Sequence, residues 1–109
     1  MQIDVRTHSL DLAEVLKSYL ERRLRFALSR FGERVGQITV RLSRNARTEV
    51  ECRISTELKP FGRVAVEEAD TDLFAAIDRA TGRIGRLFGR ELQRTHDARV
   101  GRESVRLAA

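Results

Sequence analysis

The sequence has a single cysteine, only two lysines and no long apolar run. Cys52 has no partner for an internal disulfide, which is typical of a cytoplasmic protein. No stretch approaches the roughly 18 consecutive apolar residues of a membrane span, so we expect no membrane association. The opening residues alternate apolar and polar side chains, which is not the pattern of a signal peptide. The composition therefore predicts a globular cytoplasmic protein.

The sequence also lacks the motifs of catalysis and of cofactor binding. It has no glycine-rich phosphate loop and no Cys/His cluster at metal-ligand spacing. His8 is expected in a turn and His96 in the C-terminal tail. Cys52 is expected to lie on a strand and to face the protein core. We therefore expect no enzymatic activity, no cofactor, no metal and no small-molecule substrate.

The net charge is +5 over 109 residues, from 21 basic and 16 acidic side chains. This length supports one domain with one modest core. All basic residues except Lys17 and Lys59 are arginine, whose planar group of donors suits phosphates and bases. Codon usage in a GC-rich genome produces the same excess of arginine over lysine, which is an alternative explanation. The net charge suggests a polyanionic partner. Whether the arginines serve such a partner depends on their positions in the fold.

Hydrophobic periodicity predicts the element order β-α-β-β-β-α. Strands are expected over residues 2–6, 37–43, 47–57 and 63–67. The first helix is expected to end near Gly32, and the second to cover about residues 71–94. The fold class is α+β, with both helices packed on one face of a four-stranded sheet.

Short polar residues predict where the helices begin. Asp11 is the expected N-cap of the first helix, with Leu10 and Val15 as a hydrophobic staple. Asp70, in an acidic segment, is the expected N-cap of the second helix. After residue 94 the periodicity disappears, so residues 95–109 are expected to form a flexible tail behind a domain of residues 1–94.

The second helix separates into an apolar stripe and a basic arc of roughly 80°. The apolar stripe consists of Leu73, Ile77, Ala80, Ile84, Leu87 and Phe88. The arc consists of Arg79, Arg83, Arg86, Arg90 and Arg94. Like charges at this spacing repel, so an ordinary solvated face usually alternates in sign. With no carboxylate interleaved on it, the arc favours a phosphate-binding stripe over a solvated face.

Three glycines, Gly82, Gly85 and Gly89, also share one side of the second helix. Glycine is unfavourable in a helix interior, so the strip needs a reason. It indicates close approach of an RNA backbone, tight packing of a partner helix, or merely a tolerant solvent face. The sequence leaves these alternatives open.

One arc of the first helix mixes aromatic and basic residues: Tyr19, Arg22, Arg23, Phe26 and Arg30. Rings and guanidinium planes both stack on bases, so this mixture suits RNA. In the alternative interpretation the two rings pack against the neighbouring helix, while the arginines extend to solvent.

A family resemblance begins with residues 72–78, Asp-Leu-Phe-Ala-Ala-Ile-Asp. This segment follows a strand that ends in acidic residues, and a basic run over 83–87 comes after it. Together with the opening strand and the first helix, these features resemble the ribosome hibernation-promoting factor family, in its short form, which includes ribosome-associated inhibitor A. The likeness covers about residues 1–94.

The resemblance implies a fold similar to double-stranded RNA-binding domains and a ribosome-binding domain over residues 1–94. It also implies binding to rRNA of the small ribosomal subunit, in the channel that mRNA and tRNA use. Such a protein competes with mRNA and tRNA and inhibits translation in idle or stressed cells. We further expect a monomer off the ribosome.

The resemblance places rRNA contacts on Lys17, Arg23, Arg83, Arg86 and Arg90. The two helical arcs add Arg22, Arg30, Arg79 and Arg94. Two other functions fit the same charges: a protein-interaction module that docks an acidic protein, and a general binder of double-stranded RNA.

Overall fold

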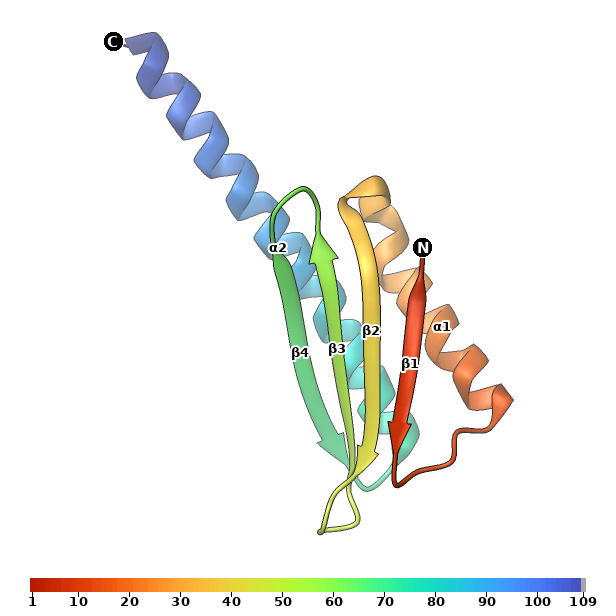
Figure 1. Ribbon diagram of the computed structural model, residues 1–109. Coiled ribbons are helices and arrows are strands. Elements are labelled where there is room, and N and C mark those ends of the chain that lie inside the picture. The colour runs from red at the N-terminus through yellow and green to blue at the C-terminus, as the bar shows by residue number, and fades with distance from the viewer. Residues whose placement is uncertain (109) are drawn as a thin grey trace.

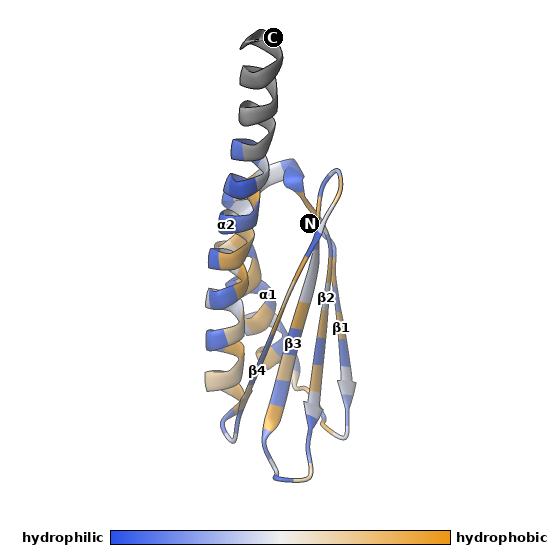
Figure 2. Ribbon diagram, turned by 90° about the vertical axis from the view of Figure 1, so that its left-hand side faces the viewer, coloured by the Kyte–Doolittle hydropathy of each residue, from blue (hydrophilic) through white to orange (hydrophobic). Residues whose placement is uncertain are grey.

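Four strands form one mixed sheet, and two helices cover one of its faces (Figures 1 and 2). The computed structural model describes the backbone of residues 1–108 and the side chains of residues 1–97. The elements are β1 (Ile3–His8), α1 (Glu14–Leu28), the 3-10 helix η1 (Ser29–Arg34), β2 (Val35–Arg44), β3 (Val50–Leu58), β4 (Arg63–Asp70) and α2 (Leu73–Ala108). The predicted element order and the placement of both helices on one face are confirmed.

The strands lie in the order β1-β2-β3-β4, which is also their order along the chain. β1 and β2 are parallel, so the chain must cross over between them, and α1 makes this crossover. The remaining neighbours are antiparallel. The register places one apolar row across the whole sheet, formed by Val5, Val40, Ile54 and Val66. This row faces the helices because alternate residues of a strand point to opposite faces.

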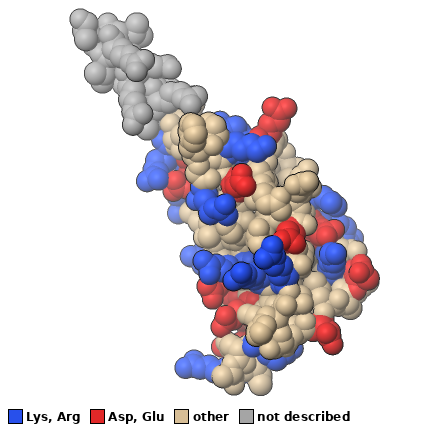
Figure 3. Space-filling model, in the orientation of Figure 1, with Lys and Arg blue, Asp and Glu red and all other residues tan. Residues whose placement is uncertain are grey.

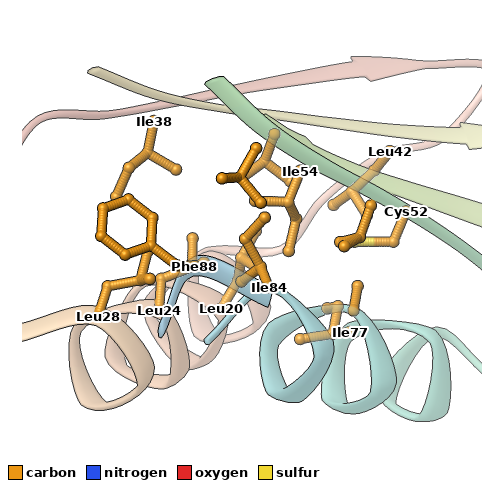
Figure 4. Packing of buried hydrophobic residues seen from close by; sticks show 14 of the residues in the cluster. Leu20, Leu24, Leu28, Ile38, Leu42, Cys52, Ile54, Ile77, Ile84 and Phe88 are labelled. Carbon is orange, nitrogen blue, oxygen red and sulfur yellow. The ribbon is translucent and has the colours of Figure 1, made fainter. Parts of the chain in front are cut away.

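The core lies between the sheet and the two helices (Figure 4). α1 contributes three fully buried leucines four residues apart, Leu20, Leu24 and Leu28. α2 contributes Ala76, Ile77, Ala80, Ile84 and Phe88, also fully buried. The predicted apolar stripe of the second helix is therefore confirmed, with Leu73 and Leu87 partly buried at its borders.

The predicted start of the first helix is wrong. The N-cap is Ala13, which makes no side-chain capping bond, so Asp11 lies outside the helix. Val15 is 75% exposed and cannot form the hydrophobic staple. Leu10 and Leu12 instead pack against the core, and the helix begins two residues after Leu12, at Glu14.

The N-cap of the second helix is Asp72. The sequence predicted Asp70 at this position, and that prediction is wrong. The Phe74 N–H donates to Asp72 Oδ1 at 3.0 Å, which is the bond of an N-cap residue. Asp70 still belongs to β4, where it pairs with Val50. The Asp72 N–H donates to Asp70 Oδ1 at 2.8 Å, and this bond, together with Arg79, lowers the pKa of Asp70.

α2 runs to Ala108, so the predicted helix end near residue 94 is wrong (Figure 1). Loss of apolar periodicity does not stop a helix, and residues 95–108 contain no proline. Thr95 donates to the carbonyl of Glu91, and Gln93 donates to Asp97, both within the helix. The flexibility expected for residues 95–109 stays a prediction, since side chains beyond residue 97 lie outside the described part. Among the described helices none is long and apolar enough to cross a membrane.

We predict that Cys52 is inert in the folded protein. The side chain is fully buried, and burial raises the pKa of its thiol to about 12. Only roughly 10⁻⁴ of the thiol is then ionised at pH 8, and the thiolate is the reactive form. Labelling with a disulfide reagent such as DTNB should be negligible for the native protein and rapid in guanidinium chloride. Rapid labelling under native conditions would contradict this placement.

Candidate nucleic-acid interface

A groove of about 180 Å³ runs between α1 and α2 on the surface away from the sheet. Its lining comes from α1, η1 and α2: Arg23, Phe26, Ala27, Arg30, Thr81, Gly82, Gly85 and Arg86. Three of the predicted site residues therefore meet here from three elements, Arg23 from α1, Arg30 from η1 and Arg86 from α2. The groove combines three guanidinium groups with an apolar floor, which suits a ligand that carries both phosphates and bases.

Two glycines allow the helices to approach closely enough to form this groove. A Cβ on Gly85 would lie 3.2 Å from the carbonyl oxygen of Ala27, and one on Gly89 would lie 3.2 Å from the ring of Phe31. These two positions therefore support the interpretation of tight helix packing. Gly82 differs, because only the guanidinium end of a neighbouring arginine comes within 4 Å of its Cβ position.

This difference predicts opposite effects of larger side chains at the two kinds of glycine. Gly82→Ala should raise the free energy of unfolding by up to about 1 kcal/mol, because alanine favours the helix and its Cβ meets only the flexible end of the Arg86 side chain. Gly85→Leu should lower it by about 1–3 kcal/mol, because the side chain forces α1 and α2 apart. Chemical denaturation measures both. Equal stabilities of the two variants would contradict the packing role of Gly85.

Asp78 of α2 joins the two helices through Tyr19 and Arg23 of α1. The Tyr19 hydroxyl donates to Asp78 Oδ1, and Arg23 Nε lies 3.4 Å from the same oxygen. The Arg23 contact is an ion pair and not a hydrogen bond, since Nε is buried without a hydrogen-bond partner. Asp78 thus fixes the position of a groove arginine. Sequence reasoning missed this role, because 59 residues separate Asp78 from Tyr19.

The two aromatic residues of the α1 arc behave differently. Tyr19 packs edge-on against Phe74 of α2, with ring centroids 5.3 Å apart, as the packing alternative predicts. Phe26 is 82% exposed at the rim of the groove, so the packing alternative is wrong for this ring. Arg30, also at the groove, lies over the Phe31 ring at 4.7 Å from its centroid. An exposed ring among arginines is free to stack on a base.

The hydrogen bond to Asp78 raises the pKa of Tyr19. Asp78→Asn should therefore shift this pKa down toward its ordinary value of 10.0. Tyr19 is the sole tyrosine and the chain has no tryptophan, so phenolate absorbance during a pH titration reports it directly. Because the folded-state pKa is raised, the bond stabilises the fold below pH 10 and this stabilisation is lost as the pH rises further.

The matched control for this titration is Asp97→Asn, which removes a carboxylate from the same helix without touching Tyr19. Its Tyr19 pKa should equal that of the wild type. An unchanged pKa in Asp78→Asn would show that the Tyr19–Asp78 bond does not form in solution.

Three arginines of the α2 arc are paired with carboxylates. Arg79 Nη2 lies 2.7 Å from Asp70 Oδ2, and Arg83 Nη1 lies 3.2 Å from Glu68 Oε1. The same two arginines donate to backbone carbonyls of β4, at Ala69 and at residue 67. Arg94 pairs with Glu91, at 2.8 Å, on its own helix. The expectation of an arc free of carboxylates is wrong, because β4 supplies partners for Arg79 and Arg83, and Glu91 of α2 pairs with Arg94.

The remaining predicted residues are exposed, and in the described part of the chain they form no ion pair. They are Lys17, Arg22, Arg30, Arg86 and Arg90. Arg86 lines the groove, and Arg90 lies one helical turn beyond it. Lys17 lies about 120° from Arg23 around the axis of α1, so it does not share the groove face.

The four-stranded sheet with two helices on one face defines an α+β fold that two solved structures share. The structure is similar to the crystal structure of the Thermus thermophilus Protein Y N-terminal domain, with a TM-score of 0.71 and 32% identity over 83% of this chain and 98% of that one. It is also similar in fold to a ribosomal subunit interface protein from Coxiella burnetii, with a TM-score of 0.76 and 13% identity over 85% of this chain and 99% of that one. No curated protein matches the chain.

Residues 3–96 match the family described as Sigma 54 modulation protein / S30EA ribosomal protein. The chain belongs to this family, and its resemblance to the hibernation-promoting factors is confirmed. The family is one of ribosome-associated factors and not a known family of enzymes.

Proposed function

We propose that this protein is a cytoplasmic ribosome hibernation factor that inhibits translation in idle or stressed cells. In this proposal it binds rRNA of the small ribosomal subunit in the channel of mRNA and tRNA. One observation carries the proposal within the family: arginines from two helices converge on one groove beside an exposed phenylalanine. That combination is what a folded RNA surface requires, because backbone phosphates and unstacked bases are both within reach.

The free arginines are the strongest candidates for phosphate contacts. Arg86 and Arg90 are exposed and unpaired in the described part, so binding a phosphate costs them no existing ion pair. Arg22 of α1 and Arg30 of η1 lie four residues before and after Phe26, where the ring would stack on a base while the guanidinium groups bind adjacent phosphates. Arg23, held by Asp78, contributes a fixed charge to the groove wall.

The other predicted residues contribute less in this proposal. Arg79 and Arg83 would have to exchange the carboxylates of β4 for phosphates, which offsets part of the gain. Arg94 faces the same exchange with Glu91. Lys17, outside the groove face, would bind a separate phosphate or none.

The proposed mechanism is steric and needs no chemical step. The sheet holds the two helices rigidly, and their basic surface anchors the domain to rRNA. While it occupies the channel, mRNA and tRNA are excluded. Because phosphate binding releases counterions, the affinity should fall steeply as salt increases.

The test replaces Arg86 and Arg90, the site arginines of α2 that are unpaired among the described side chains. Arg86→Glu/Arg90→Glu should weaken co-sedimentation with small ribosomal subunits at least tenfold, because two phosphate contacts become repulsive. Arg25→Glu/Arg47→Glu is the matched control: it makes the same charge change at exposed positions outside the groove and should bind nearly as the wild type. Added mRNA and tRNA should displace the wild-type protein.

Other outcomes identify the other candidate functions. Full ribosome binding by Arg86→Glu/Arg90→Glu would contradict the proposal and leave the groove for an acidic protein partner. Competition by free duplex RNA as strong as that by small subunits would indicate a general binder of double-stranded RNA. Equal loss in both double variants would show that net charge, and not the groove, controls binding.

A further inference from the structure

The face of the sheet that the helices leave uncovered carries a second group of arginines, unused by the proposed groove. Figure 3 views this face, and basic side chains form a band across the middle of it. The strand register explains the band, since Arg6 lies opposite Arg41 and Arg41 lies opposite Arg53. Like charges directly opposite one another on neighbouring strands are destabilising. On its other side Arg53 lies opposite Glu67, so the row carries three arginines and one carboxylate and keeps a net positive charge.

The central arginines of the band have no carboxylate partner. Arg6 pairs with Asp4 at 3.0 Å, whereas neither Arg41 nor Arg53 forms an ion pair with any described side chain. Both are exposed. Their charges are thus available to an external anion.

Beside these two arginines the sheet surface forms an open hollow of about 270 Å³. Its lining is entirely basic or hydroxylic: Thr39, Arg41, Arg53, Ser55 and Arg63. The register explains the hollow, because a row of short side chains, Thr39, Ser55 and Ala65, crosses three strands next to the row of Arg41 and Arg53.

Arg63 closes the hollow from the side of β4. Its Nη1 donates to Ser55 Oγ at 2.9 Å, which holds the guanidinium against the row of short side chains. Acidic residues border the hollow, since Asp4 lies opposite Thr39, Glu57 opposite Arg63 and Glu67 opposite Arg53. The lining itself presents three guanidinium groups and two hydroxyls without a carboxylate.

This donor set matches a phosphate group. Guanidinium groups bind phosphate oxygens in pairs of charge-assisted hydrogen bonds, and hydroxyls can donate to the remaining oxygens. The hollow is open and lies on a flat sheet surface, so a phosphate carried by a long polymer can reach it without being enclosed.

We propose that this hollow binds a backbone phosphate of RNA, as a second RNA site on the face opposite the helical groove. The inference deepens the proposed function, because one molecule would then hold two RNA segments, one on each face. Two linked sites bind more tightly than either alone, since the second contact is made at high effective concentration.

The first experiment tests the hollow by itself. Amide and arginine side-chain NMR signals of the full chain are followed while inorganic phosphate is added, and then while a uridine oligomer of about 16 nucleotides is added. Phosphate should shift the signals of Thr39, Ser55 and the three arginines of the hollow. Arg41→Thr/Arg53→Thr should remove these shifts and should fold about as stably as the wild type, because the lost repulsion between Arg41 and Arg53 offsets the lost attraction of Arg53 to Glu67.

The matched control is Arg44→Thr/Arg47→Thr, which removes the same charge at the connection between β2 and β3, outside the hollow. It should keep the phosphate shifts of the wild type. Shifts that survive in Arg41→Thr/Arg53→Thr, or that vanish equally in the control, would overturn the proposal. Shifts with phosphate and none with the oligomer would mean a site for small anions, which also overturns an RNA site.

The second experiment tests two-sided binding. Protein captured on an immobilised uridine oligomer should retain a second, labelled oligomer, and Arg41→Thr/Arg53→Thr should reduce this retention roughly tenfold. Arg86→Glu/Arg90→Glu should also reduce it, through the other face. If Arg86→Glu/Arg90→Glu keeps full retention while Arg41→Thr/Arg53→Thr loses it, the helical groove does not bind RNA and the sheet site stands. The reverse result retains the groove and overturns the sheet site.

Discussion

Where α1 crosses α2, the absence of a side chain at Gly85 lets the two helix backbones lie almost in contact. The position of every groove residue follows from this contact. Arg23 and Arg30 face Arg86 across a narrow gap because Ala27 fits against the glycine between them. Asp78 offsets part of the repulsion among these three cations, because its carboxylate forms an ion pair with Arg23. A wider helix pair would separate the basic arcs and leave no shared groove.

The sequence predicted the strands, the two-helix layer and the apolar stripe of α2, because these follow from local periodicity. It placed both helix starts wrongly, since the choice among nearby aspartates depends on how long β4 continues and on where Leu10 and Leu12 pack. The nine candidate site residues were found on helical arcs, yet a helical wheel shows one helix at a time. It could not reveal that Glu68 and Asp70 reach Arg79 and Arg83, or that Phe26 points to solvent while Tyr19 does not.

The glycine strip shows how one sequence pattern can have two causes. Gly85 and Gly89 are required by the neighbouring helix, whereas Gly82 opens the groove floor beside Arg86. Sequence alone could offer both explanations but could not divide the residues between them. The division depends on which residues of α1 and η1 lie opposite each position, and this is a property of the packed pair.

The arginines that bind β4 have a consequence for the behaviour of the protein at high concentration. β4 is an edge strand of the sheet, so its outer backbone groups could pair with a strand from another molecule. Arg79 and Arg83 donate to carbonyls of this strand, at Ala69 and Glu67, and so occupy acceptors that an incoming strand would need. Two residues of the basic arc thereby protect an exposed sheet edge against aggregation, whatever else they bind.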